Sequence, residues 1–220
     1  MFATAQVRPQ VRLLPRSLLV KTGPVDFAEW NSRPLLGWIM RQRFRMALSL
    51  LPASLGRLLE VGYGSGVFMP ELAPRVRELF GIDVHAHEQD VARTLARVGI
   101  TARLQSGSAE KMPFEAGMFD AIVAVSALEF IPDLAAAVDE FVRTLAPTGT
   151  LIVVTPAHSP LADAGLRLLT GRKAENDFEG RRQGIISTLL RQFRIDREIR
   201  WPMNALPLYT ALRLRPRVAG

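Results

Sequence analysis

Two acidic side chains and three glycines are spaced in a way that suits a nucleotide-type ligand. Gly62, Gly64 and Gly66 alternate along the chain, Glu60 precedes them, and Asp83 follows Gly62 by 21 residues. Glycine allows a backbone with positive φ and a ligand closer than a Cβ would permit. A carboxylate about 20 residues beyond such a turn lies at the tip of the neighbouring strand, where its two oxygens can accept both hydroxyls of a ribose. These residue types therefore indicate a site for a ribose-bearing ligand.

The elements that must position these residues are a strand before the glycines and a helix after them. Residues 58–61 form an apolar stretch that ends at an acid and a valine, which predicts a short strand. Helical spacing of apolar residues predicts a helix over 67–76, and a second strand over 78–83 would carry Asp83 at its end. The helix N-terminus would offer unpaired N–H groups and a positive dipole end to an anion. A glycine-rich turn with no ligand is the alternative that this segment alone leaves open.

The glycine spacing argues against two common nucleotide motifs. The dinucleotide pattern G-x-G-x-x-G would need a third glycine at position 67, which is Val67, and no lysine completes a Walker pattern. The pattern E-x-G-x-G-x-G after a strand instead resembles motif I of the class I S-adenosylmethionine (SAM)-dependent methyltransferases.

Three later segments resemble this family in the same order. Residues 107–114 are similar to its G-[DS]-A-E-x-[LM]-P-F segment, with Ser108 where the family commonly has aspartate. Residues 126–133 are similar to the segment that lines its methyl-transfer cleft. Residues 145–150 resemble its L-x-P-G-G turn, with Thr148 in place of the first glycine. The resemblance extends from Leu58 to Val154.

The resemblance implies an α/β fold: a doubly wound, Rossmann-like, seven-stranded and mostly parallel sheet whose last strand is antiparallel, plus an N-terminal helical extension. We expect one domain overall, with residues 1–52 as an N-terminal arm and helical cap and residues 53–220 as the SAM-binding part. The apolar pattern predicts a helix over 26–51 in two pieces, with Ser32 as a cap and Pro34 in the first turn. This helix either packs on the sheet or forms a lid or lipid-contacting surface.

The resemblance also implies SAM as the cofactor, with S-adenosylhomocysteine (SAH) as the product left after transfer. The expected cofactor-binding residues lie in motif I, at the acid of the second strand, and in the segments that follow the third and fourth strands. They are Glu60, Gly62, Tyr63, Gly64, Gly66, Asp83, Val84, Ser108, Ala109, Glu110 and Ser126. Because Ser108 replaces the common aspartate, Glu110 or a backbone group is the alternative contact for the adenine amino group.

Two polar residues near the expected cleft are candidates for a general base. Glu129 follows the fourth strand, and His158 follows the fifth at the edge where doubly wound sheets bind ligands. His85 and His87 follow Asp83 and are expected to pack beside the donor or to face solvent. Some relatives hold a metal with a Glu-His pair after the fourth strand, but Phe130 occupies the histidine position here, so no metal is predicted.

Charge is distributed unevenly along the 220 residues. The formal net charge is +7, yet residues 51–180 carry 17 acidic against 11 basic side chains, so the excess of basic groups lies in the flanks. Such flanks could face an anionic membrane, a nucleic acid or an acidic substrate, or could simply be solvated. The chain has no cysteine, which excludes disulfides and cysteine-dependent methyl transfer to cytosine.

Three functions are compatible with these patterns. The favoured one is methyl transfer to a small, hydrophobic or lipid-like acceptor in a bacterial cytoplasm, with peripheral membrane contact through the basic N-terminal helix as a further expectation. The second is an RNA or protein methyltransferase that uses the basic flanks, although no nucleic-acid partner is expected. The third is a SAM-binding protein without catalysis. The sequence leaves the oligomeric state and the methylated atom open.

Overall fold

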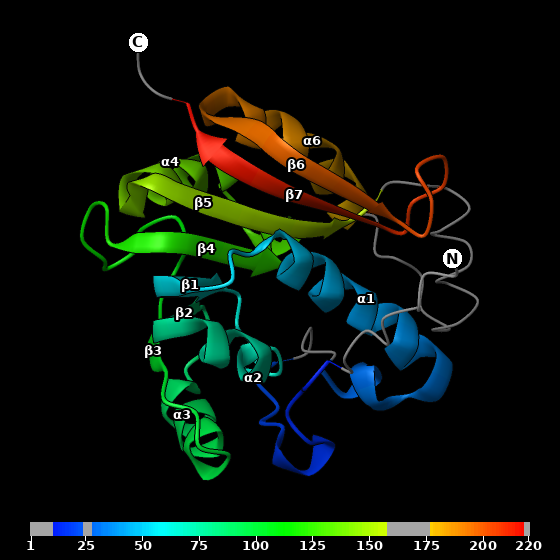
Figure 1. Ribbon diagram of the computed structural model, residues 1–220, viewed down its shortest axis with the longest axis vertical. Coiled ribbons are helices and arrows are strands. Elements are labelled where there is room, and N and C mark those ends of the chain that lie inside the picture. The colour runs from blue at the N-terminus through cyan, green and yellow to red at the C-terminus, as the bar shows by residue number, and fades with distance from the viewer. Residues whose placement is uncertain (1–10, 24–27, 158–176, 218–220) are drawn as a thin grey trace, which may run out of the picture.

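A seven-stranded sheet forms the centre of the protein in the computed structural model, which describes residues 11–23, 28–157 and 177–217 (Figure 1). The strand order is β3-β2-β1-β4-β5-β7-β6. The strands are β1 (Leu55–Val61), β2 (Val76–Asp83), β3 (Arg103–Ser106), β4 (Phe119–Val125), β5 (Leu145–Pro156), β6 (Phe193–Trp201) and β7 (Tyr209–Pro216). β1 to β5 pair in parallel, and β7 runs antiparallel to both β5 and β6. The predicted fold class is therefore confirmed.

Helices cover both faces of this sheet. One face carries α1 (Pro34–Leu50), α2 (Met69–Leu72) and α3 (Glu88–Arg97), and the other carries α4 (Leu134–Thr144) and α6 (Asp177–Gln192) (Figure 1). Short 3₁₀ turns are η1 (Arg16–Leu18), η2 (Ala28–Ser32), η3 (Ala73–Arg75) and η4 (Leu128–Phe130). Strand order reverses between β1 and β4, and ligands of such sheets bind outside the carboxyl ends of the strands at that point.

The sequence of the central strands explains their two-sided burial. Residues 121–124 of β4 are fully buried, as expected for an apolar parallel strand covered on both faces. Successive strand residues point to opposite faces. Accordingly, Leu58 of β1 packs with the core residues of α1 and α3, whereas Leu59 packs with those of α4 and α6.

The predicted helix over 67–76 is wrong in its extent. Only α2, a single turn, and the 3₁₀ turn η3 form there, and β2 already begins at Val76 rather than at Glu78. Pro70 lies in the first turn of α2, where it is tolerated, but Pro74 has no N–H to continue the hydrogen bonding of α2. The one-turn helix α2 does not provide the dipole of a long helix, so the loop backbone itself must provide the donors.

Two other boundaries differ from expectation. β5 begins at Leu145, because Leu145 pairs with Phe119 before the register shifts and Thr150 pairs with Ala121. Residues 146–149 therefore form an irregularity within a longer strand. Ser32 does not cap α1: the cap position is Arg33, without a side-chain hydrogen bond, and Pro34 is in the first turn as predicted.

α1 is anchored on the sheet through an aromatic pair. Phe44 is stacked on Phe68, which lies just beyond the glycines, with ring centroids 4.5 Å apart and planes at 19°. Both side chains are buried, with 3% and 1% of their surface exposed. The contact ties the N-terminal helix to the segment that follows the glycine loop.

Replacing Phe44 with alanine is expected to lower the free energy of unfolding by about 3–5 kcal/mol, because it removes a fully packed aromatic side chain and leaves a cavity. Denaturant unfolding would measure this loss. The control is Val98→Ala at a position that is 40% exposed, where a change within about 0.5 kcal/mol is expected. A loss below about 1 kcal/mol for Phe44→Ala would show that the aromatic pair does not anchor α1.

None of the helices that the structure describes has the length and apolar character needed to cross a lipid bilayer.

Candidate active site

The glycine loop begins where β1 ends and is confined on two sides. Gly62, Gly64 and Gly66 have φ of +72°, +51° and +71°, a region that favours glycine. A Cβ on Gly62 would lie 2.6 Å from the Cβ of Ala127, and one on Gly66 would lie 3.0 Å from Cγ1 of Val91. The backbone conformation therefore favours glycine at all three positions, and close packing adds to this requirement at Gly62 and Gly66.

Asp83 contacts this loop directly. Its Oδ2 accepts a hydrogen bond of 2.8 Å from the backbone N–H of Gly64, and its Oδ1 lies 3.4 Å from the backbone nitrogen of His85. The carboxylate is at the carboxyl end of β2, as the 21-residue spacing predicts. Its side chain is 15% exposed, so part of it remains accessible from solvent.

Glu60 is a buried acid at this site, 4% exposed. Strand alternation places it on the same face as Leu58, the face that α1 covers. Its Oε2 has no hydrogen-bond partner among the described residues. The pKa of Glu60 is raised to about 8. Burial is the largest cause, the negative charge of Asp83 acts in the same direction, and the positive charge of Arg43 partly offsets both. A cationic group beside Glu60 would favour its ionised form.

The side chain of Tyr63 is buried against β2 and the segment that follows it. Its side chain is 2% exposed, and its ring packs edge-on against His85 at 4.9 Å. A Cβ on Gly81 of β2 would lie 2.8 Å from Cδ1 of this ring. Burial, followed by the charges of Asp83 and Glu88, raises the pKa of the Tyr63 phenol. Only the Tyr63 backbone is therefore placed for contact with a ligand in the loop.

The segments after β2 and β3 lie beside Asp83. Val84 is 78% exposed, so its side chain is accessible to a ligand beside Asp83. The N–H of Gly107 donates to the carbonyl of Asp83 at 2.8 Å, which brings the following residues to the same edge. Ala109 is buried.

Ser108 and Glu110 hold this edge to the start of α4. The Ser108 hydroxyl donates to Oε2 of Glu110 at 3.0 Å and accepts from the Glu110 N–H at 3.1 Å. Oε1 of Glu110 accepts from the N–H of Asp133 at 2.6 Å. Both Glu110 oxygens already accept hydrogen bonds, and the Ser108 hydroxyl already donates one and accepts one, so Ser108, Glu110 and the backbone all stay candidates for the adenine contact.

Ser126 and Glu129 follow β4 at the same edge. Ser126 is a non-glycine residue with φ of +52°, and its N–H donates to the carbonyl of Val154 at 2.7 Å. Glu129 lies in η4 and is 3% exposed. His158, the other candidate base, lies outside the described residues. The structure therefore brings together all the predicted donor-side residues and Glu129, apart from the inward side chain of Tyr63.

Comparison with known proteins agrees with this arrangement. A family model described as a methyltransferase domain matches residues 59–153. The protein-L-isoaspartate O-methyltransferase of Methylorubrum populi is 32% identical over 165 residues, which cover 74% of this chain and 70% of that protein. The chain belongs to the class I SAM-dependent methyltransferases.

Two further proteins are similar at lower sequence identity. The ubiquinone biosynthesis O-methyltransferase of Psychrobacter cryohalolentis is 28% identical over 142 residues, covering 57% of this chain and 53% of that protein. The N-methyltransferase NodS of Bradyrhizobium japonicum, solved with SAH, superposes with a TM-score of 0.62 at 23% identity, covering 91% of this chain and 96% of NodS. NodS shares the fold of this methyltransferase.

The residues present fit SAM, the cofactor of the family. SAM carries a positively charged sulfonium and an ammonium group. The unpartnered, buried Oε2 of Glu60 is suited to a cation, and the buried hydroxyl of Ser65 in the glycine loop also has no hydrogen-bond partner among the described residues. The exposed Val84 beside Asp83 is suited to the face of a purine.

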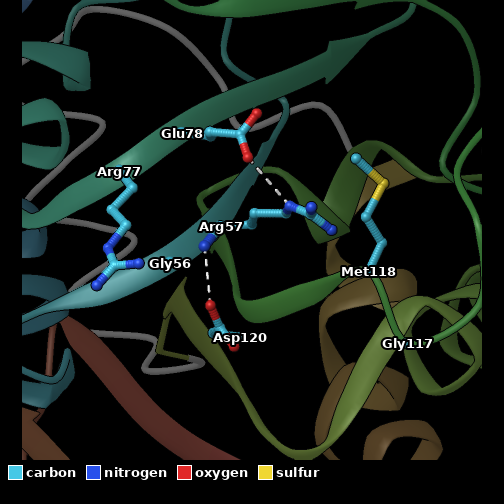
Figure 2. Close-up of a pocket in the computed structure, with 7 residues that line it drawn as sticks. All are labelled: Gly56, Arg57, Arg77, Glu78, Gly117, Met118 and Asp120. Atoms are coloured by element: carbon cyan, nitrogen blue, oxygen red, sulfur yellow. Dashed lines mark hydrogen bonds and ion pairs between the residues drawn. The ribbon is translucent and has the colours of Figure 1, made fainter.

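A separate pocket of about 320 Å³ lies at the opposite edge of the methyltransferase sheet, and Figure 2 shows it. It is lined by residues at or near the amino ends of β1, β2 and β4, including Arg57, Glu78 and Asp120. The N–H of Arg57 donates to Oδ2 of Asp120 at 2.8 Å, and Nε of Arg57 lies 3.1 Å from Oε1 of Glu78 (Figure 2). These polar groups satisfy one another, and the pocket is at the wrong end of the strands for the donor.

Proposed function

We propose that the SAM donor of this methyltransferase binds across the glycine loop at the carboxyl ends of β1, β2 and β4. The observation that carries this placement is the hydrogen bond that joins Asp83 to Gly64, because it brings the ribose-binding acid against the loop. In this proposal Asp83 accepts the ribose hydroxyls, Glu60 faces the cationic end of the donor, and Val84 covers the adenine ring. The other proposed contacts are the backbones of Gly62, Tyr63, Gly64 and Gly66, and the residues Ser108, Ala109, Glu110 and Ser126.

The donor supplies an electrophilic methyl group on a sulfonium, and the protein must position the reactants and keep water away. The glycine loop provides close backbone contact. Phe44 and Phe68 support α1 on the sheet face that Glu60 also occupies. Glu129, buried in η4 after β4, is the described candidate for accepting a proton from the acceptor. His158 remains a prediction for the same role.

We further propose that the acceptor is a small, hydrophobic or lipid-like molecule. Trp38 of α1 packs edge-on against Trp201 at 5.4 Å, and Trp201 stacks with Tyr209 at 6.5 Å. Tyr209 pairs with Pro156 at the carboxyl end of β5, so this aromatic cluster lies near the edge where the donor is proposed to bind. A relative named for ubiquinone biosynthesis also favours this acceptor class.

A protein carboxylate is the second candidate acceptor. The protein-L-isoaspartate O-methyltransferase of Methylorubrum populi matches 74% of this chain, and this similarity favours a protein carboxylate. The basic flanks could contact an acidic protein surface. They are equally the basis for the proposal that the N-terminal helix contacts an anionic membrane.

Transfer of label from methyl-tritiated SAM would separate the two acceptor classes. We expect label in the organic phase when the protein is incubated with bacterial lipid extract, and none with an isoaspartyl peptide. Asp83→Asn protein is the matched control and should transfer no label above background. Label in the peptide but not in the organic phase would replace the first proposal by the second. Sedimentation with anionic liposomes tests the membrane contact separately.

A further inference from the structure

His85 lies two residues beyond Asp83, and its side chain is directed at the glycine loop rather than at solvent. Only 8% of the side chain is exposed, and Nε2 lies 3.0 Å from the carbonyl oxygen of Gly64. Nδ1, on the other side of the ring, lies 3.1 Å from the backbone nitrogen of His87. The ring of Tyr63 closes one side of the imidazole at 4.9 Å.

These contacts define the tautomer of His85. A backbone N–H can only donate, so the His87 N–H requires an unprotonated Nδ1 as its acceptor. A carbonyl oxygen can only accept, so the Gly64 carbonyl requires a proton on Nε2. The Nε2–H neutral imidazole satisfies both groups at once. Oδ2 of Asp83 lies 3.9 Å from Nε2, beyond hydrogen-bond distance, and so does not compete for this proton.

Gly64 is consequently held at both of its backbone polar groups. Its N–H donates to Asp83 and its carbonyl lies within hydrogen-bond distance of His85. Glycine has many accessible backbone conformations besides its φ of +51° here, so these two contacts select one of them. The peptide between Gly64 and Ser65 is planar, so fixing the carbonyl also fixes the direction of the Ser65 N–H. Residues 83–87 therefore set the conformation of the middle of the glycine loop.

We propose that His85 is a positioning residue for the methyl donor. Its hydrogen bond to the Gly64 carbonyl holds the glycine loop in one conformation. In that conformation the Gly64 N–H is bonded to Oδ2 of Asp83 and not to Oδ1. This leaves Oδ1, whose contact with the His85 backbone is 3.4 Å long, and the second lone pair of Oδ2 for the two ribose hydroxyls. The inference rests on the proposed placement of the donor across this loop. His85 itself touches neither donor nor acceptor in the proposal.

Two substitutions separate the hydrogen bond from the packing of the ring. Asparagine at position 85 places its amide at the level of Nδ1, so it can accept from His87 but cannot reach Gly64. Glutamine is one methylene longer, so its amide N–H can donate to the Gly64 carbonyl. We expect His85→Asn to bind SAH about tenfold more weakly than wild type, because the free loop is then no longer held in its binding conformation and must be ordered when SAH binds. We expect His85→Gln to bind within about twofold of wild type.

Calorimetric titration of the full chain with SAH measures these affinities, with thermal unfolding of each variant recorded alongside. The control is His87→Asn, since the His87 side chain is 44% exposed and its backbone N–H is retained. Wild-type affinity in His85→Asn would overturn the inference, and so would a His85→Gln variant as weak as His85→Asn. If wild type does not bind SAH, or if Asp83→Asn binds as wild type does, the donor placement itself fails.

Nitrogen-15 NMR of the histidine rings provides a test on the unmodified protein, which decides the question even if the variants fold poorly. We expect His85 to show the Nε2–H neutral tautomer both free and with SAH bound. A ring protonated only on Nδ1 would overturn the inference, because Nε2 would then have no proton to donate to the Gly64 carbonyl.

Discussion

Replacing Asp83 with asparagine is expected to weaken binding of SAH by about 100-fold or more. Hydrogen bonds to a charged acceptor contribute about 1.5–3 kcal/mol each, and the proposed role gives Asp83 two of them with the ribose hydroxyls. The variant also loses the charge that faces the Gly64 N–H at 2.8 Å. Calorimetric titration of wild type and variant with SAH measures the change directly.

The opposite end of the sheet offers a matched control. Asp120, near the amino end of β4, also accepts a backbone N–H at 2.8 Å, in this case from Arg57 (Figure 2). Asp120→Asn should therefore disturb a similar strand-to-strand contact while leaving SAH affinity within about twofold of wild type. Equal losses in the two variants would mean that Asp83 matters only for folding, and no loss in Asp83→Asn would remove the proposed donor site.

At alkaline pH, replacing Glu60 with glutamine is expected to raise the stability of the ligand-free protein relative to wild type and to weaken SAM binding relative to wild type. In the folded protein the pKa of Glu60 is raised to about 8 from an ordinary value of 4.5, so the folded state holds an extra proton between these values. Stability from the neutral carboxyl is fully present below pH 4.5 and is lost as the pH rises through about 8. Glutamine carries no such proton and stays neutral.

The stability of the variant relative to wild type should therefore rise by roughly 4 kcal/mol between pH 5 and pH 9 in the absence of ligand. Urea unfolding at the two pH values measures the difference, and titration of all other groups is common to both proteins. A relative stability that does not change with pH would show that the pKa of Glu60 is close to its ordinary value.

The binding of SAM should show the complementary pattern. A cationic donor favours the ionised form of Glu60, so wild type must release a proton to bind below pH 8, and its affinity should rise by up to about tenfold per pH unit between pH 6 and 8. The Glu60→Gln variant should lack this slope. Titration of the amine of SAM itself is shared by both proteins, so the difference between them isolates Glu60. Parallel slopes would mean that Glu60 does not face the cationic end of the donor.

The donor edge illustrates how much the sequence determined by itself. The alternating glycines indicate a turn with positive φ, which depends only on neighbouring residues, and all three glycines have positive φ in the structure. Gly62 and Asp83 follow two consecutive strands, and the number of residues between them is the number that the family has. The spacing alone therefore predicted that the acid lies beside the loop. The mostly parallel sheet with an antiparallel last strand followed from the resemblance. The helix over 67–76 was predicted too long because the apolar spacing was followed across Pro70 and Pro74.

Contacts between segments far apart in the chain were decided only by the tertiary structure. The sequence left His85 between packing and solvent, whereas the fold places its ring between Gly64 and His87 and so assigns its tautomer. Glu110 is occupied by Asp133, 23 residues away, and Tyr63 is buried against β2. The raised pKa of Glu60 likewise depends on burial beneath a helix contributed by residues 34–50. Hydrogen-bond partners and desolvation are properties of three-dimensional neighbours, which residue type and spacing do not specify.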